Sequence, residues 1–468
     1  MGVGMPGEPF DVVLLGGGTG GYVAAIRGGQ LGLRVAVIEQ DKVGGTCLHR
    51  GCIPTKALLK SASVATLVHN AAEYGVNVSG IAYNYEQAVA RSGKIVDQNF
   101  NGIKFLFRKN NVTLIEGTGR LKDSRTVIVT KPDGSTEEVG GKAVIIDTGS
   151  RARPIAGIPF DGERVINSDH STWLPEVPKR VIIRGGGATG VEFASIYHEF
   201  GAEGTLVGRV VPNEDHEVSQ QLTRSFTRSG IRIIPGYRPT ADDFDITEGG
   251  VRMRVTQDGK EEVIEADTLL VAPGRQGNIE AIGLEEVGVR PEKGSTPVDE
   301  YCRTNVDGVF AIGDVVGQML LAHTAMHQGI IVMEYLAGEK PLPLDPNRVP
   351  VCTYSHPEIG SMGLTENEAK EAGYEVKVGK FPLRANGKAL IEGEGDGFIK
   401  MVADKDTDDI LGVHMIGGHA TELIAEAGLA KLLEATPWEG ALSIHPHPTI
   451  SEVVGEAALA VDGRAIHI

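Results

Sequence analysis

The sequence predicts an α/β protein with two doubly wound, parallel-sheet domains and a third, α+β domain at its C-terminal end. Two observations carry this prediction. A strand–glycine loop–helix–strand unit occurs twice, at residues 11–39 and 181–209. After about residue 347 no such glycine loop occurs, and alternating strands and helices run to the end. The length of 468 residues allows about three domains.

The first unit has every part of a dinucleotide-binding fingerprint. The apolar strand Val12–Leu15 leads into Gly16, Gly18 and Gly21, a helix follows, and the next strand ends at Glu39. The glycines allow a tight turn, a close approach of the backbone to a diphosphate, and close helix–strand packing. The helix N-terminus faces the diphosphate, and the acid accepts hydrogen bonds from a ribose. We therefore predict a Rossmann-like nucleotide site here.

The second unit repeats the glycines but lacks the acid. Its fingerprint is Gly185, Gly187 and Gly190, and the position that corresponds to Glu39 is Gly208, followed by Arg209. The sequence therefore predicts a second Rossmann-like domain whose ribose contacts differ from those of the first.

Further segments fit the same class. Apolar strands that end in glycine turns are expected at 143–150, 268–275 and 308–316. Polar, β-rich stretches with Asp-Gly turns at 133–134 and 258–259 predict antiparallel hairpins. Asp147 and Arg184 are unusual, because each places a charge in or beside an apolar strand, and Pro273 also looks foreign to its context.

Composition excludes several classes of protein. A net charge of -17 speaks against duplex nucleic acid as a partner. No apolar run is long enough to cross a membrane, and the N-terminus has no secretory pattern, so we expect a cytoplasmic protein. Four cysteines do not form a secreted disulfide framework. No ligand set with metal-site spacing is present, so we expect no metal.

Two of the four cysteines, Cys47 and Cys52, lie five residues apart at the start of an expected helix. In an ideal helix their Cα atoms would be about 8.6 Å apart, whereas a disulfide needs less than about 7 Å. Either the two do not bond, or the first turn is distorted, which Gly51 and Pro54 favour. A distorted, reducible bridge at a helix start would suit redox chemistry; two free, buried cysteines are the alternative.

Six motifs in order resemble the pyridine nucleotide–disulfide oxidoreductase family. They cover nearly the whole chain: the first fingerprint at 16–21, GGTCLHRGCIPTKALL at 44–59, TGS at 148–150, the second fingerprint at 185–190, AIGD at 311–314 and HPHPTISE at 445–452. Within the family, the chain resembles members that oxidise dihydrolipoamide on a carrier protein.

The resemblance implies two cofactors. For FAD it implies Gly16, Gly18, Gly21, Glu39, Thr46, Lys56, Gly117, Thr148, Gly149, Asp314 and Ala322. For NAD it implies the region of Gly185, Gly187, Gly190, Gly208, Arg209 and Gly274.

The resemblance also assigns catalytic roles. Cys47 would exchange with the substrate, and Cys52 would pass electrons to the flavin. His447 would act as acid–base and Glu452 would orient it, as in a catalytic triad. Two further site residues form an expected ion pair beside the flavin, Lys56 with Glu192.

Domains and partners follow from the same resemblance. We expect FAD-binding parts at 1–150 and 276–347, a nucleotide-binding domain at 151–275 and a dimerisation domain at 348–468. Each active site would combine the cysteines of one subunit with His447 and Glu452 of its partner, which makes a homodimer obligatory. The expected further partner is a lipoyl carrier domain of a 2-oxo acid dehydrogenase or glycine-cleavage complex.

The second fingerprint leaves the choice between NAD and NADP open. Family members that use NAD carry an acid where Gly208 stands, and Arg209 could instead meet the 2′-phosphate of NADP. Gly190 argues against this, since NADP types often have alanine there, and the whole-chain resemblance favours NAD. The rival interpretations are an NADP-linked disulfide reductase similar to glutathione reductase, and a catalytically impaired dimeric component of a 2-oxo acid dehydrogenase complex.

Overall fold

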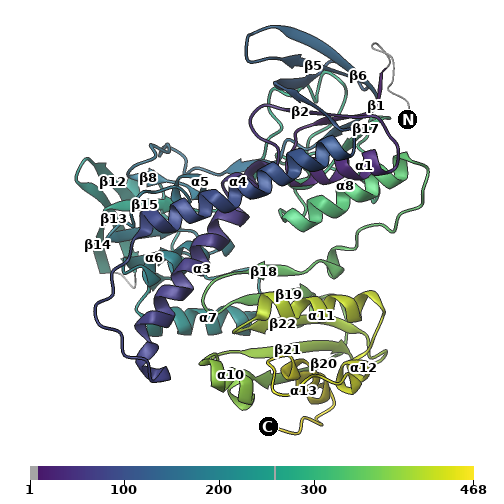
Figure 1. Ribbon diagram of the computed structural model, residues 1–468. Helices are drawn as coiled ribbons and strands as arrows, with labels where there is room; N and C mark the ends of the chain where they lie inside the picture. Colours follow the sequence, from purple (N-terminus) through teal and green to yellow (C-terminus); the bar gives the residue numbers. More distant parts are fainter. Residues whose placement is uncertain (1–8, 258–259) are drawn as a thin grey trace. The chain divides into compact units, whose positions relative to one another are not determined.

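The computed structural model describes residues 9–257 and 260–468, which form two compact units (Figure 1). The first unit comprises the described residues up to Leu58 together with Glu86–Arg153 and Gly274–Leu344. The second comprises Leu59–Tyr85, Pro154–Pro273 and Asp345–Ile468. The four-part division expected from the resemblance stays a prediction.

The first unit contains a seven-stranded sheet in the order β3-β2-β1-β6-β5-β4, with β17 pairing with β6. Strands β3, β2, β1, β6 and β17 are parallel, and β4, β5 and β6 form an antiparallel meander. The bounds are β1 Phe10–Leu15, β2 Val35–Glu39, β3 Thr113–Glu116, β4 Thr118–Leu121, β5 Thr126–Thr130, β6 Thr136–Ile146 and β17 Val309–Ala311, with a separate ribbon of β7 Ser150–Ala152 and β16 Arg275–Gly277. The predicted hairpin with its turn at 133–134 is confirmed.

Helices cover one face of this sheet. The helices are α1 Thr19–Gln30, α2 Gly45–His49, α3 Cys52–His69, α4 Tyr85–Lys109 and α8 Ala322–Leu336, of which α3 and α4 each run from one unit into the other. Val12 and Leu14 of β1 pack toward α1, α4 and α8, and Val13 and Leu15 pack toward the meander. Helices α1 and α8 lie side by side (Figure 1), and Gly329 permits this because a Cβ there would lie 2.8 Å from the Gly20 carbonyl oxygen.

The second unit contains a five-stranded parallel sheet in the order β11-β10-β9-β15-β8. The bounds are β8 Val165–Ile166, β9 Arg180–Arg184, β10 Glu203–Val207, β11 Arg232–Ile234 and β15 Thr268–Val271, with α5 Ser168–Ser171, α6 Ala188–Glu199 and α7 His216–Ser229. An antiparallel sheet of β12 Phe244–Thr247, β13 Gly250–Gln257 and β14 Lys260–Ala266 follows. The β13–β14 hairpin is confirmed, and its expected turn at 258–259 lies outside the described residues.

The C-terminal part of the second unit is α+β, as predicted. Its antiparallel sheet has the order β18-β19-β22-β21-β20. The bounds are β18 Val351–Thr353, β19 Ile359–Gly363, β20 Val376–Pro382, β21 Phe398–Asp404 and β22 Ile410–Ile416, with helices α9 Glu366–Glu371, α10 Gly387–Glu392, α11 Ala420–Leu432, α12 Pro437–Leu442 and α13 Glu452–Val461. Short 3-10 turns are η1 Ala71–Tyr74, η2 Ala241–Asp243, η3 Gly313–Val316, η4 Pro346–Arg348 and η5 Leu383–Ala385. Strands β21 and β22 are buried along their whole length, mainly under α11 and α13.

A buried charged cluster ties α7 and α9 to this sheet. Lys400, on β21, has a side chain that is only 3% exposed and lies 3.1 Å from Asp215, 2.9 Å from Glu217 and 2.8 Å from Glu366. Removal of one partner from such a cluster leaves an uncompensated buried charge. We refer to these four residues as the Lys400 cluster.

Within the part of the chain that the structure describes, no helix combines the length and the apolar character needed to cross a membrane.

Candidate functional site

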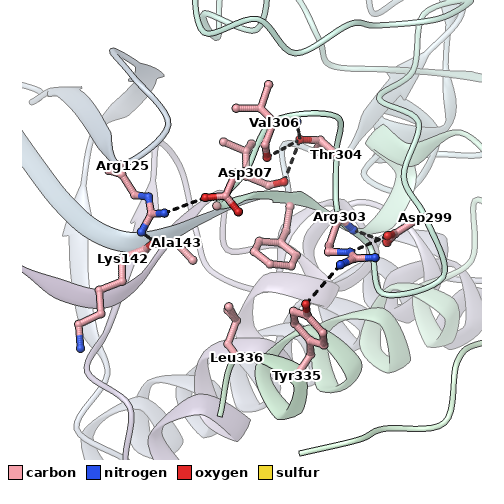
Figure 2. Close-up of a pocket in the computed structure, with 13 residues that line it drawn as sticks. Arg125, Lys142, Ala143, Asp299, Arg303, Thr304, Val306, Asp307, Tyr335 and Leu336 are labelled. Carbon is pink, nitrogen blue, oxygen red and sulfur yellow. Dashed lines mark hydrogen bonds and ion pairs between the residues drawn. The ribbon is translucent and has the colours of Figure 1, made fainter. Parts of the chain in front are cut away.

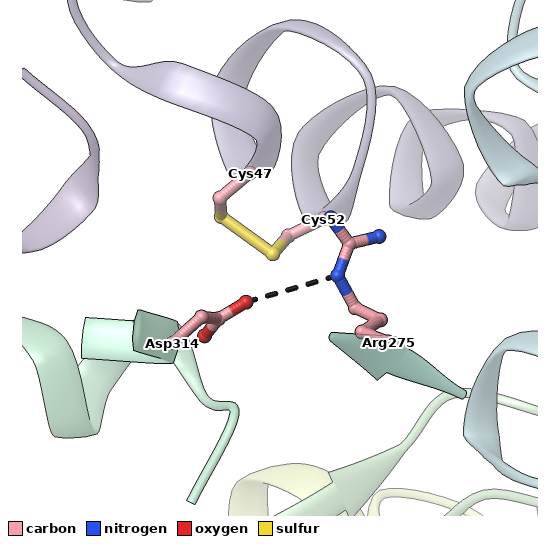
Figure 3. Close-up of a disulfide and its surroundings, with 4 residues drawn as sticks. All are labelled: Cys47, Cys52, Arg275 and Asp314. Carbon is pink, nitrogen blue, oxygen red and sulfur yellow. Dashed lines mark ion pairs between the residues drawn. A yellow bond between two sulfur atoms is a disulfide. The ribbon is translucent and has the colours of Figure 1, made fainter. Parts of the chain in front are cut away.

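Cys47 and Cys52 form a disulfide that joins two consecutive helices, α2 and α3 (Figure 3). Their Cα atoms lie 4.7 Å apart, within the range that a disulfide allows. The single helix assumed for the spacing argument is wrong, because α2 ends at His49 and α3 begins at Cys52. Gly51 permits the sharp return of the chain: a Cβ there would lie 3.0 Å from the Thr46 carbonyl oxygen. Of the two alternatives, the bonded pair on a distorted backbone is confirmed.

An ion-paired group lies in the surroundings of the disulfide (Figure 3). Arg275 donates from Nε to the Ser150 hydroxyl (2.7 Å) and from its terminal nitrogen to the Ser150 carbonyl (2.8 Å). Its Nε lies 3.7 Å from the Asp314 carboxylate, which also accepts the Ser150 hydroxyl. These contacts fix the orientation of Asp314. Arg275 ends the predicted strand segment 268–275, and the sequence carries no signal that points to these contacts.

The first fingerprint offers the donors that a diphosphate needs. Helix α1 begins after Gly18, which has no side-chain cap, and the first turn has no acid, so the helix N-terminus suits an anion. Gly16 has a φ of +109°, and a Cβ there would overlap the Asp147 carbonyl. The Glu39 carboxylate accepts the Gly17 N–H at 2.8 Å, which holds it beside the glycine turn. These residues fit FAD.

The other residues expected at FAD also lie in the first unit. Thr46 is in α2, and Ala322 is the first residue of α8, whose N-terminus has no side-chain cap. Thr148 donates its hydroxyl to the Asn278 carbonyl at 2.7 Å. Gly149 and Gly117 have φ values of +70° and +157°, which favour glycine. Their contacts with a flavin stay predictions.

The second fingerprint has the same construction at the start of α6. Gly187 precedes the helix without a side-chain cap, and a Cβ on it would meet nothing within 4 Å. A Cβ on Gly190 would lie well inside 3.0 Å of the Gly185 carbonyl oxygen. Gly208 has a φ of +134°, so the backbone itself favours glycine where the first unit has Glu39. Gly274 belongs to the other unit.

Arginines gather at the carboxyl end of this second parallel sheet. Arg184 ends β9, Arg209 follows β10 and Arg238 follows β11. The Arg184 Nε is buried with no hydrogen-bond partner, and burial and the like charge of Arg238 lower the Arg184 pKa. Cations in this position suit a phosphate, which explains why a charge ends an otherwise apolar strand.

His447 and Glu452 form a hydrogen-bonded pair within the second unit. His447 Nδ1 lies 2.9 Å from Glu452 Oε1, and Thr449 N–H donates to the other carboxylate oxygen at 2.9 Å. Burial raises the pKa of Glu452, but the bonds from Thr449 and His447 outweigh it and lower that pKa overall. The carboxylate is therefore kept ionised and oriented toward the imidazole.

Exposure distinguishes His447 from the neighbouring histidine. His445 also pairs with a carboxylate, that of Glu426 at 2.8 Å, but its side chain is only 10% exposed, against 80% for His447. Only His447 presents its free nitrogen to an incoming group. The geometry therefore favours the same histidine as the resemblance does.

Lys56 and Glu192 belong to different units. Lys56 lies one turn into α3 after Cys52. Glu192 is 4% exposed in α6 and accepts the Tyr354 N–H at 3.0 Å. Their expected ion pair stays a prediction.

A separate cavity of about 510 Å³ lies in the first unit (Figure 2). It lies at the amino-terminal ends of the buried parts of β6 and β17, whereas ligands of parallel sheets bind at the carboxyl ends. Arg125 is already bonded to Asp307, and Arg303 to Asp299 and Tyr335. The third lining cation, Lys142, is paired with Asp11, so each cation that lines the cavity already has an acidic partner. Among the described residues, no group of three His, Cys, Asp or Glu could hold a metal ion.

Comparison with known proteins gives full-length matches. The family profile described as pyridine nucleotide-disulphide oxidoreductase matches residues 10–329, and the profile of its dimerisation domain matches residues 349–458. Dihydrolipoyl dehydrogenase of Bacillus subtilis is 48% identical over 98% of this chain and 99% of its own length. That of Zymomonas mobilis is 42% identical over 98% and 99%.

Solved structures agree in fold. The crystal structure of LpdA from Mycobacterium tuberculosis has a TM-score of 0.89 at 29% identity and covers 96% of this chain and 98% of its own. The HOCl-induced flavoprotein disulfide reductase RclA from Escherichia coli, as its Cu(II) complex, has a TM-score of 0.85 at 26% identity and covers 96% and 99%.

Proposed function

The chain belongs to the pyridine nucleotide-disulphide oxidoreductase family, and from this premise we propose that it acts as a dihydrolipoyl dehydrogenase that oxidises dihydrolipoamide on a carrier protein. The observation that carries the proposal is the Cys47–Cys52 disulfide, which opens α3 in the same unit as the first fingerprint. The relatives of the same name align over almost the whole chain.

The disulfide performs the substrate step by exchange. One substrate thiolate attacks the sulfur of Cys47, the Cys47–Cys52 bond breaks, and the Cys52 sulfur leaves as a thiolate. The second substrate thiol attacks the mixed disulfide, releases Cys47 and closes the cyclic disulfide of lipoamide. Two electrons thus pass from the substrate dithiol to the two cysteines; one proton goes to His447 and the other to Cys47.

His447 and Glu452 would remove the proton from the attacking substrate thiol. The exposed imidazole accepts the proton of the attacking thiol, and the ionised Glu452 stabilises the imidazolium that forms. We propose that this pair acts on the disulfide of the partner subunit in a homodimer. The match to the dimerisation domain supports a homodimer.

Two cofactors complete the reaction. Gly16, Gly18, Gly21 and Glu39 would hold FAD, with the other residues named above for the flavin, and the α6 N-terminus would hold the nicotinamide nucleotide. When bound, FAD supplies the hydride chemistry that links the dithiol to NAD.

NADP is a second candidate acceptor. The absence of a carboxylate at Gly208 and the arginines 184, 209 and 238 favour it, because a 2′-phosphate needs cations where NAD needs an acid. The whole-chain match to dihydrolipoyl dehydrogenases favours NAD.

We further propose a lipoyl domain of a 2-oxo acid dehydrogenase or glycine-cleavage complex as the partner, and the cytoplasm as the location. The four-part division into FAD, nucleotide, central and dimerisation domains belongs to this proposal.

The test is dihydrolipoamide-dependent reduction of NAD⁺ and NADP⁺, measured side by side as kcat/KM. We expect activity with a preference for NAD⁺, loss of this activity in Cys47→Ser, and retained quinone reduction by NADH in the same variant. Preference for NADP⁺ would select the second candidate. Flavin-containing protein that reduces neither nucleotide would indicate an impaired component, and lipoamide turnover by Cys47→Ser would refute the exchange step.

A further inference from the structure

Asp147 places a buried carboxylate at the first fingerprint. It follows β6 directly and is 6% exposed. Its Oδ2 accepts the Gly21 N–H, in the first turn of α1, at 2.7 Å. The side chain therefore lies at the helix end that also serves the proposed diphosphate site.

The carboxylate fits only because its neighbours are glycines. A Cβ on Gly18 or Gly20 would lie 3.0 Å from a carboxylate oxygen, a Cβ on Gly21 2.6 Å, and a Cβ on Gly313 2.9 Å. Four glycines from two distant segments thus form a small polar compartment around one acid. No ion pair joins Asp147 to a cation among the described residues.

The fold itself does not require an acid here, and the second unit provides the comparison. A Cβ on Gly16 would meet the carbonyl of Asp147, and a Cβ on Gly185 would meet that of Ala272 in the same way. Ala272 therefore stands in the second unit where Asp147 stands in the first. The second fingerprint forms the same turn with alanine at this position. The turn therefore does not require the Asp147 carboxylate.

Two acidic groups act on Asp147. Glu39, at the end of β2, and Asp314, in η3, both raise its pKa, and Arg275 is paired with Asp314. Burial and these two carboxylates raise the pKa of Asp147 well above its usual value, against the opposing effect of N–H bonds from Gly21 and Gly18. The diphosphate of FAD would add two more negative charges at the same helix end.

We infer that binding of FAD at the first fingerprint is coupled to protonation of Asp147, so that each flavin bound brings one proton onto this carboxyl group. Without the flavin, Asp147 ionises once the pH exceeds its raised pKa, and its carboxylate is then the anion at the α1 N-terminus. With the flavin, the diphosphate takes that role and Asp147 is neutral. The inference rests on the proposed flavin site, and it predicts that FAD is released more readily as the pH rises.

The experiment measures the FAD dissociation constant of the full-length protein between pH 6 and 9, by dilution of the holoenzyme and the fluorescence of released FAD. We expect the dissociation constant to rise with pH, by up to tenfold per pH unit, as uptake of one proton requires. Asp147→Asn and Asp147→Ala should bind FAD with little dependence on pH. Asp147→Ala reproduces the residue of the second unit, so folding is expected even if the asparagine variant fails.

Two further measurements separate the possible failures. The number of protons taken up per FAD bound follows from the heat of FAD binding to apoprotein, measured in phosphate and in Tris. This number should be close to one in the parent protein above neutral pH and close to zero in both Asp147 variants. Asp307→Asn, which changes an exposed acid of the same unit, should behave as the parent protein. Equal pH dependence in parent and Asp147 variants would overturn the inference, whereas failure of the parent protein to bind FAD would overturn the proposed function.

Discussion

The third glycine of the second fingerprint allows a sharp test of how the nucleotide site is built. In Gly190→Ala the new Cβ would overlap the Gly185 carbonyl oxygen, and the two segments would have to separate by more than an ångström. Forced separation of packed backbone costs about 1–3 kcal/mol. Because the moving segment is the phosphate loop, we expect a roughly 5- to 150-fold rise in the KM for the nicotinamide nucleotide, together with a lower melting temperature.

The same loop supplies the comparison variants. Gly187→Ala adds a Cβ that meets no protein atom within 4 Å, so it should raise the KM by obstructing the diphosphate while leaving the melting temperature unchanged. Gly204→Ala, in β10, also meets no atom and should change neither quantity.

The assay is steady-state reduction of NAD⁺ or NADP⁺ by dihydrolipoamide, with thermal unfolding measured on the same samples. FAD content should stay the same in all three variants, since the first fingerprint belongs to the other unit. If Gly190→Ala kept the parent KM and melting temperature, the close packing of Gly190 on Gly185 would not be a determinant of the site. If Gly187→Ala lowered the melting temperature as much as Gly190→Ala, steric overlap would not be the cause.

Three further predictions concern the second unit. His447→Gln should lower kcat for lipoamide by about 10²–10⁴-fold, and His445→Gln by much less, since its side chain is buried and held by a carboxylate; equal losses would contradict the assignment. Lys400→Met should lower the free energy of unfolding by about 3–5 kcal/mol, whereas Lys405→Met, at an exposed ion pair, should change it by about 0–1 kcal/mol; urea unfolding decides. Burial raises the pKa of Glu214 from 4.5 to about 7, so the folded protein holds a proton that the unfolded chain releases, and stability falls as the pH rises through this window. Glu214→Gln should remove up to about 3 kcal/mol of that fall between pH 5 and 8, and an unchanged pH dependence would refute the role of Glu214.

The sequence predicted those parts of the structure whose residues are close together in the chain. Both fingerprints, with their strands and helices, were predictable because strand, turn and helix start lie within 30 residues and each leaves a periodic or glycine signal. The cysteine spacing left two alternatives, because an ideal helix excludes the bond and the sequence does not state where a helix breaks. The decisive fact, a break between His49 and Cys52, depends on how closely Gly51 approaches Thr46.

Long-range neighbours explain what the sequence could not resolve. Arg184 looked foreign to its strand because Arg238, which shares its environment, comes from a loop after β11. The choice between His445 and His447 needed the family resemblance, since the sequence does not show that the His445 side chain is nearly buried and that of His447 is exposed. Arg275 had no local signal of its own; it is identified by its contacts with Ser150 and Asp314, which come from distant segments.

The two fingerprints of this chain show how one loop can acquire different electrostatics without a change of backbone. In both, the first glycine packs against the carbonyl of the residue that ends a neighbouring strand, Asp147 in one case and Ala272 in the other. The ribose position changes in the same direction, from Glu39 in the first unit to Gly208 in the second. The first site thus carries two acids at these positions and the second carries none, while Arg184 and Arg209 adjoin the second. A dinucleotide with an additional phosphate monoester is therefore disfavoured at the first site and tolerated at the second, so any use of NADP should be confined to the second fingerprint and should leave the flavin site selective for FAD.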